Sequence, residues 1–253
     1  MVAFETVRYG PEPDQFGQWW PPAHGGPADR PPPVVVLLHG GYWRAPYRLD
    51  LLEPLAADLS ARGYGVWNLE YRRVGVPGGG WPGTFDDVSA GLDAVAALAP
   101  PGPRRVAVVG HSAGGHLALW SCGRPDAARV APGFAVSLAG VCDLVEGYRQ
   151  TLSRGAVAEL LGGGPDEVPE RYDAACPTRL LPLGVPQVVV HGTEDADVPF
   201  AFGPRYAAAA TAAGDDCTLL ALPGVEHFAL IDPGSAAWAT VATHLDRWRR
   251  GPA

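Results

Sequence analysis

The segment Gly110-His111-Ser112-Ala113-Gly114 has the G-x-S-x-G pattern, in which a serine lies on a sharp turn between a strand and a helix. The apolar run Val106–Val109 precedes it, and we expect a helix to begin at about Ala113. Small residues on either side of such a turn relieve its crowding and leave the serine hydroxyl exposed. This context predicts that Ser112 is a nucleophile. The competing interpretation is an ordinary serine at the N-terminus of a helix.

A second glycine-containing segment, His39-Gly40-Gly41-Tyr42-Trp43, directly follows an apolar run that predicts a strand over Pro33–Leu38. When a serine attacks a carbonyl group, the negatively charged oxygen that forms needs two backbone N–H donors. The amide of Ala113 is one expected donor, and the amide of Gly41 or Tyr42 is the other. The competing interpretation is a glycine turn that only ends the strand.

A nucleophilic serine also needs a histidine as its general base. Three of the seven histidines, namely His191, His227 and His244, lie well after Ser112. His227 follows the last predicted strand, Thr218–Leu222, in a loop that can fold back over the serine, and we predict it as the base. His191 ends the preceding strand, and His244 lies in the last predicted helix. The competing interpretation of His227 is a loop histidine bound to the backbone.

The base in turn needs a carboxylate that orients it, and the expected chain order is serine, acid, histidine. Glu194, Asp195 and Asp197 all follow the predicted strand Gln187–Val190. We predict Asp195 as the acid, with Asp197 as the next candidate. Asp143, which follows the strand before that one, is a minor candidate. Helix capping and solvation are the competing roles for these carboxylates.

The composition limits the other chemistry that is open to the chain. Its 253 residues are 47% apolar, which is enough to bury a core, and we expect a single domain over residues 1–253. All 19 basic residues are arginine, so a Walker A loop and a lysine Schiff base are excluded. The net charge of −8 argues against a nucleic-acid partner. The stretch Pro21–Pro33 is either a flexible lead-in or a hairpin connection.

No cofactor, metal or membrane segment is expected. The cysteines are scattered and form no C-x-x-C pair, so we interpret them as thiols rather than metal ligands or a disulfide framework; they are Cys122, Cys142, Cys176 and Cys217. The N-terminal residues lack a basic region followed by an apolar run, so no signal peptide is visible and a cytoplasmic location is expected. The uncharged stretch Val106–Gly123 contains histidines and glycines, so we interpret it as strand, turn and helix rather than a membrane span.

Apolar runs alternate with segments of helical spacing along most of the chain, which is typical of an α/β fold with a mainly parallel central sheet and helices on both faces. The strands are predicted over Pro33–Leu38, Tyr64–Tyr71, Val106–Val109, Phe134–Leu138, Gln187–Val190 and Thr218–Leu222. The helices are predicted over Leu49–Arg62, about Thr84–Leu98, from about Ala113, about Phe202–Ala213 and about Ser235–Arg249. Residues 145–183 break this rhythm, and we expect a small, partly helical cap there.

With these motifs, the chain resembles the α/β-hydrolase superfamily from about Pro33 to Trp248. The string from His191 to Pro199 is similar to the acid loop of prolyl-oligopeptidase-like and esterase members, which implies that Asp195 is the acid. The strings His39–Trp43 and Gly110–Ala118 resemble those of kynurenine formamidases and related H-G-G-x-W esterases. Hormone-sensitive-lipase-like enzymes carry a third glycine where this chain has tyrosine, which counts against that group.

The resemblance implies a serine hydrolase without a cofactor that cleaves a small amide or ester. The first expectation is a kynurenine formamidase that converts N-formylkynurenine to kynurenine and formate. The alternatives are a general carboxylesterase acting on short-chain or aromatic esters, and a catalytically weak receptor on the same fold. Trp43 and Phe228 flank the catalytic loops and are expected to line the substrate site, with packing in the core as the competing interpretation. The expected partner is a small molecule, and a homodimer is left open.

Overall fold

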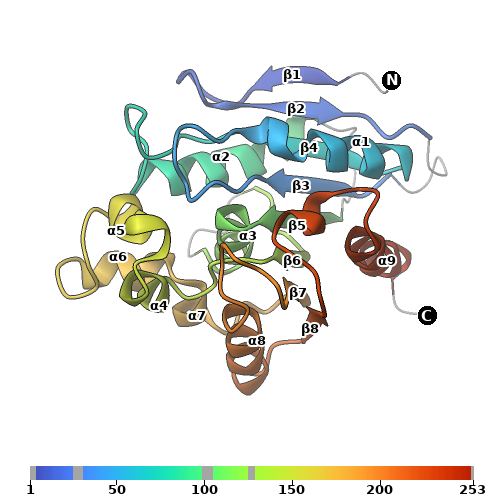
Figure 1. Ribbon diagram of the computed structural model, residues 1–253. Coiled ribbons are helices and arrows are strands. Elements are labelled where there is room, and N and C mark those ends of the chain that lie inside the picture. The colour runs from blue at the N-terminus through green and yellow to red at the C-terminus, as the bar shows by residue number, and fades with distance from the viewer. Residues whose placement is uncertain (1–3, 25–30, 99–104, 125–128, 252–253) are drawn as a thin grey trace.

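The computed structural model describes residues 4–24, 31–98, 105–124 and 129–251. These residues form one eight-stranded sheet with the strand order β1-β2-β4-β3-β5-β6-β7-β8 (Figure 1). The strands are β1 (Glu5–Arg8), β2 (Phe16–Trp20), β3 (Val34–Leu38), β4 (Gly65–Leu69), β5 (Val106–His111), β6 (Phe134–Leu138), β7 (Gln187–Gly192) and β8 (Cys217–Leu222). Strands β3 to β8 are parallel to one another, whereas β2 pairs antiparallel with β1 and β4. The predicted, mainly parallel sheet is confirmed.

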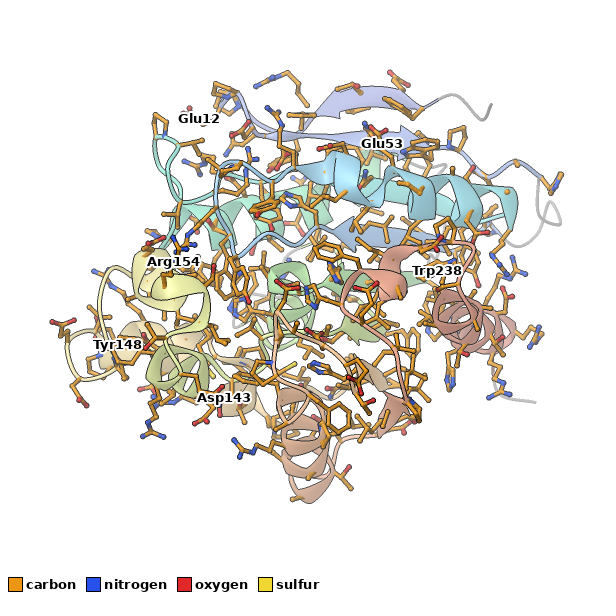
Figure 2. The ribbon with its side chains drawn as sticks, viewed as in Figure 1. Glu12, Glu53, Asp143, Tyr148, Arg154 and Trp238 are labelled. Carbon is orange, nitrogen blue, oxygen red and sulfur yellow. The ribbon has the colours of Figure 1, made fainter. Side chains whose placement is uncertain are left out.

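Helices cover both faces of the sheet, because successive side chains of a buried strand point to opposite faces. Along β3, Val34, Val36 and Leu38 belong to one apolar cluster, and Val35 and Leu37 belong to the other. The first cluster is completed by α2 (Gly83–Leu98), α3 (Ala113–Gly123) and α8 (Phe202–Ala212). The second is completed by α1 (Glu53–Ala61) and α9 (Ala236–Arg250), from which the buried Trp238 points inward (Figure 2).

The helix predicted over Leu49–Arg62 is divided in two. Leu49–Leu52 forms a 3-10 turn, η1, and the α-helix α1 begins only at Glu53. Pro54 lies in the first turn of α1, where its missing N–H has no helical partner to lose. The proline therefore sets the beginning of the α-helix.

Strands β1 and β2 were missed in the sequence analysis. β2 pairs with β4, and Trp19 lies opposite Trp67 in that register. A Cβ atom at Gly17 would come within 2.6 Å of the Trp67 ring, so the glycine makes room for the indole. Because β2 contains this glycine and precedes a glycine- and proline-rich segment, its local pattern is weak. Within the stretch Pro21–Pro33, residues 25–30 lie outside the described residues.

Short helices between β6 and β7 form the predicted cap. They are α4 (Leu144–Arg149), η2 (Leu152–Arg154), α5 (Ala156–Leu161), α6 (Pro169–Ala175) and α7 (Pro177–Leu180), and Figure 1 shows them at one end of the sheet. Arg44, which follows β3, holds the cap: it donates to the Ser153 carbonyl at 2.8 Å and to Glu159 Oε2 at 2.7 Å. Buried cap side chains such as Leu160 and Tyr172 belong to the same apolar cluster as α2 and α3.

The uncharged stretch Val106–Gly123 is divided between β5, a turn at Ser112 and α3, as the sequence predicted. Within the ranges that the structure describes, no helix has both the length and the apolar character needed to cross a membrane. The last strand, β8, is followed by the 3-10 turn η3 (Phe228–Ile231), which leads into α9.

Replacing Leu245 by alanine tests the packing of α9 on the sheet. Leu245 is fully buried in the second cluster, so Leu245→Ala should lower the free energy of unfolding by about 2–5 kcal/mol. Thr243, two residues earlier, is exposed, and Thr243→Ala should change the free energy of unfolding by no more than about 0.5 kcal/mol. Chemical denaturation measures both, and equal losses would contradict this packing.

Candidate active site

Ser112 occupies the turn between β5 and α3, with φ 56° and ψ −117°. This backbone conformation is unfavourable for a residue with a side chain. It is stabilised by the hydrogen bond from the Ser112 amide to the Leu138 carbonyl, at 2.8 Å. A Cβ atom at Gly110 would lie 1.9 Å from the Gly114 carbonyl oxygen, which explains the need for glycine at that place in the motif. The Ser112 side chain makes no capping hydrogen bond to α3, so the helix-cap interpretation is wrong.

The loops after β7 and β8 bring the predicted acid and base into contact. His227 Nδ1 lies 2.7 Å from Asp195 Oδ2. The other carboxylate oxygen, Oδ1, accepts hydrogen bonds from the amides of Asp197 at 2.9 Å and Val198 at 2.8 Å. Burial alone would raise the pKa of Asp195, but the hydrogen bonds from His191 and His227 outweigh it and hold the pKa well below its usual range. Asp195 therefore stays ionised and can orient His227.

The alternative carboxylates do not form this contact. Asp197 and Glu194 are exposed, and Asp197 contributes its amide to Asp195. Asp143 accepts the amide of Glu146 at 3.0 Å and caps α4. The geometry thus favours Asp195 over every other acid that the sequence offered.

His191 is a contact of Asp195 that the sequence analysis did not identify. Its Nε2 lies 2.9 Å from the Val198 carbonyl and 3.4 Å from Asp195 Oδ2. A carbonyl oxygen only accepts hydrogen bonds, so this nitrogen carries the proton. The only sequence signal was its place at the end of β7, four residues before Asp195. His191 thus fixes the acid loop and gives the carboxylate a second partner.

His111 links the base loop to the serine turn. Its Nε2 donates to the His227 carbonyl at 3.1 Å, and the two imidazole rings lie 4.4 Å apart. Burial, followed by the proximity of His227, lowers the pKa of His111 to about 3. His111 is therefore neutral at any pH near 7. Through this contact the carboxyl ends of β5, β7 and β8 bring the Ser112 turn close to the loops that carry Asp195 and His227.

The glycine segment after β3 lies against the same turn. A Cβ atom at Gly40 would lie 3.1 Å from the Ser112 Cβ, and Gly41 has a φ of 104°. His39 anchors the segment: its Nε2 lies 2.9 Å from Glu70 Oε1, and its Nδ1 lies 2.8 Å from the Gly40 carbonyl. Burial would raise the pKa of Glu70, but His39 and other donors lower it, so the carboxylate is charged. The amides of Gly41 and Tyr42 thus belong to a well-anchored loop beside Ala113.

Trp43 does not line the site as the sequence predicted. It is fully buried, and its Nε1 donates to His116 Nδ1 at 3.2 Å. His116 Nε2 in turn faces the Ala175 carbonyl at 2.9 Å, and burial lowers the pKa of His116 to about 4. Trp43 is therefore a core residue. Phe228, by contrast, is 50% exposed, and its ring lies 5.2 Å from that of His227.

Asp195, Asp197 and His227 each offer one potential metal-ligand atom, and these atoms lie within 4.8 Å of one another. The close hydrogen bond between Asp195 Oδ2 and His227 Nδ1 already pairs two of the residues. A metal ion would have to compete with that bond. The arrangement is better suited to proton transfer than to metal binding.

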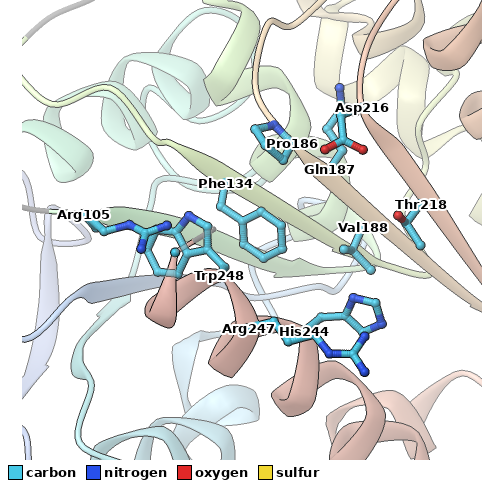
Figure 3. Close-up of a pocket in the computed structure, with 11 residues that line it drawn as sticks. Arg105, Phe134, Pro186, Gln187, Val188, Asp216, Thr218, His244, Arg247 and Trp248 are labelled. Atoms are coloured by element: carbon cyan, nitrogen blue, oxygen red, sulfur yellow. The ribbon is translucent and has the colours of Figure 1, made fainter. Parts of the chain in front are cut away.

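A cavity of about 340 Å³ lies at the amino ends of the parallel strands, at the other end of the sheet from Ser112 (Figure 3). Phe134 and Gln187, which begin β6 and β7, contribute to its wall. Arg105 lies over the Trp248 ring at 4.6 Å from its centre, and Phe134 stacks on the same ring. The carboxyl ends of parallel strands, where Ser112 lies, are the usual ligand-binding edge of such sheets. This cavity is therefore separate from the candidate active site.

A parallel sheet with a serine turn after β5 and the Asp195–His227 pair after β7 and β8 defines an α/β-hydrolase, the class of serine hydrolases expected from the sequence. The BD-FAE family model matches residues 25–205, which is more than half of the chain, and the chain belongs to this family. No curated protein sequence matches the chain. None of these findings supports the kynurenine formamidase group.

Three solved structures have a similar fold. A truncated carbohydrate esterase from gut microbiota has a TM-score of 0.81 and 18% identity, over 97% of this chain and 95% of that chain. Esterase B from Lactobacillus rhamnosis has a TM-score of 0.81 and 20% identity, over 98% of this chain and 85% of that one. Est2 from the Planctomycetes species Thermogutta terrifontis has a TM-score of 0.76 and 24% identity, over 97% of this chain and 91% of that chain.

A pair of matched substitutions separates the two aspartates of the acid loop. Asp195→Asn should slow the labelling of Ser112 by a fluorophosphonate by up to about ten-thousand-fold, the loss typical of an orienting acid in a Ser-His-Asp triad. Asp197→Asn should leave the rate within about threefold, because the exposed Asp197 side chain is not bonded to His227. Labelling rates measured at pH 7 test this, and a larger loss in the Asp197 variant would refute the assignment.

Proposed function

We propose that the chain is a carboxylesterase that cleaves small esters through an acyl-enzyme intermediate. The observation that carries the proposal is the 2.7 Å contact between His227 Nδ1 and Asp195 Oδ2, in a loop that His111 ties to the Ser112 turn. Such a contact fixes the imidazole with its Nε2 free to accept a proton. Neither a binding module nor a scaffold needs this arrangement.

In the first half-reaction, His227 removes the proton of the Ser112 hydroxyl as that oxygen attacks the ester carbonyl. Ionised Asp195 stabilises the imidazolium that forms, so the charge transfer needs no rearrangement of the site. The amide of Ala113 and that of Gly41 or Tyr42 donate to the oxyanion. One such donor contributes about 3 kcal/mol to transition-state stabilisation. The imidazolium then protonates the leaving alcohol.

In the second half-reaction, His227 removes a proton from water, which attacks the acyl-serine. The same two amides stabilise the second oxyanion, and the carboxylic acid leaves. His111 is neutral at neutral pH, because burial and His227 lower its pKa to about 3. It therefore holds the loop of His227 without adding a charge that would repel the imidazolium.

The relatives favour an ester over a formamide as the substrate. The similar structures come from proteins called esterases, among them Est2, which was solved with propionate and with butyrate bound. Esterase B was solved with a tributyrin phosphonate, and esterase 2 was solved after phosphonylation by sarin. These names support a short-chain carboxylic ester as the substrate of this chain. Kynurenine formamidase activity has no comparable support.

A substrate panel tests the choice of substrate. The kcat/KM for p-nitrophenyl acetate and butyrate should exceed that for N-formylkynurenine by at least about tenfold, a difference of about 1.4 kcal/mol in transition-state stabilisation. A feruloyl ester in the same panel measures the acceptance of aromatic acids. A higher kcat/KM for N-formylkynurenine would instead establish the formamidase.

Replacing the predicted nucleophile tests the mechanism. Ser112→Ala should lower kcat on p-nitrophenyl acetate by about a millionfold and abolish fluorophosphonate labelling. Ser121→Ala, in the same helix, is the matched control and should label at the wild-type rate, because Ser121 is bonded to the Ala118 carbonyl. Mass spectrometry of the labelled peptide identifies the modified residue. Equal labelling of wild type and Ser112→Ala would rule out the nucleophile.

A further inference from the structure

The Tyr42 side chain connects two loops of the candidate active site. Its hydroxyl donates to the Asp197 carbonyl at 2.5 Å. Tyr42 follows β3 and Asp197 follows β7, and β5 and β6 lie between these strands in the sheet. Adjacent strands are about 4.8 Å apart, so the hydrogen bond joins loops whose strands are about 14 Å apart in the sheet. The loops after β3 and β7 therefore come into contact above the carboxyl ends of β5 and β6, and Ser112 directly follows β5.

This hydrogen bond closes a ring of contacts around the serine. Gly40 lies against Ser112, and His111 bonds to the His227 carbonyl. His227 bonds to Asp195, and the loop of Asp195 returns through Asp197 to Tyr42. A substrate that reaches Ser112 must fit within this ring. The tyrosine is thus a boundary of the space that the substrate occupies.

The two faces of the sheet indicate which part of the substrate meets Tyr42. The base loop packs on the face of α1 and α9, since Val225, Leu230 and Ile231 contact that cluster. Tyr42 packs on the other face, in the cluster that contains the cap. The leaving alcohol takes its proton from His227 and so lies on the side of the base loop. The acyl group is then directed to the side of the cap and Tyr42.

The Tyr42 ring is also held in a fixed position. Its ring is half-buried, and burial together with the charges of Asp197 and Asp195 raises the pKa of its hydroxyl to about 12. The hydroxyl therefore remains a donor throughout the neutral range. Its acceptor is a backbone carbonyl, which does not titrate. The bond thus holds the ring in one position at any pH at which His227 can act as a base.

Resting on the proposed esterase function, we propose that the Tyr42 side chain determines acyl-chain specificity and restricts the enzyme to esters of short-chain carboxylic acids. This role differs from that of the Tyr42 amide, which belongs to the backbone and is present in every variant. Removing the ring opens space for longer acyl chains. The oxyanion donors and the Ser112, His227 and Asp195 set remain in place.

The experiment uses p-nitrophenyl acetate, butyrate and octanoate, which share one leaving group and differ only in the acyl chain. Wild type should prefer acetate and butyrate. Tyr42→Ala should raise the ratio of kcat/KM for octanoate to that for acetate by about tenfold or more, mainly through a lower KM for octanoate, since each buried methylene contributes to binding. Tyr42→Phe keeps the ring but loses the hydrogen bond to the Asp197 carbonyl, so its ratio should lie between those of wild type and Tyr42→Ala.

Alanine and phenylalanine share the Cβ atom of tyrosine, so they match it at the φ of 50° found at this residue. Glycine would relax the loop and is avoided. Phe4→Ala is the matched control, because Phe4 is 40% exposed next to the edge strand β1, away from the cap, and should leave all three kcat/KM values unchanged. Thermal unfolding is measured for every variant, and Tyr42→Leu replaces Tyr42→Ala if the alanine variant does not fold.

The outcomes separate the two proposals. If wild type hydrolyses the esters and Tyr42→Ala lowers all three kcat/KM values by the same factor, the tyrosine only positions the acid loop and the specificity role is refuted. An unchanged chain-length profile refutes it equally. If wild type hydrolyses none of the esters, the proposed function itself fails, and the specificity role fails with it.

Discussion

The close approach of α3 to the end of β3 is the constraint on which the site depends. A Cβ atom at Gly114 would lie 2.0 Å from the Leu38 carbonyl oxygen, so no other residue fits there without moving the backbone. This contact sets the separation between the Ser112 turn and the glycine loop after β3. Because backbone atoms set it, the amide donors are fixed before a substrate arrives, and such preorganisation is the usual source of oxyanion stabilisation.

Buried histidines then hold the loops that surround this contact. Each of four such residues bonds to a backbone carbonyl of a loop or helix near the site; they are His39, His111, His116 and His191. Burial lowers the pKa of His111 and His116, so these two stay neutral near pH 7. The fold thus uses one residue type for both support and chemistry.

The sequence predicted the parts of the site that local patterns encode. Ser112 and its glycines lie within five residues, and the acid and base follow strands with clear apolar runs. The contact between Tyr42 and Asp197 joins residues 155 positions apart, so no local pattern could reveal it. Trp43 was placed in the site, but its indole is fully buried and bonds to His116, a contact 73 positions away in the chain. β2 was missed because its pairing with β4 is also non-local.

The insertion of the cap between β6 and β7 has an evolutionary consequence. The segment from Leu138 to Gln187 supplies none of the Ser112, His227 and Asp195 set, although its helices pack in the same apolar cluster as α2 and α3. Doubling the length of such a loop costs only about 0.6 kcal/mol of closure entropy. Insertions and deletions there can reshape the entrance while the reacting groups stay unchanged. The fold therefore lets selection vary the range of substrates independently of the reaction.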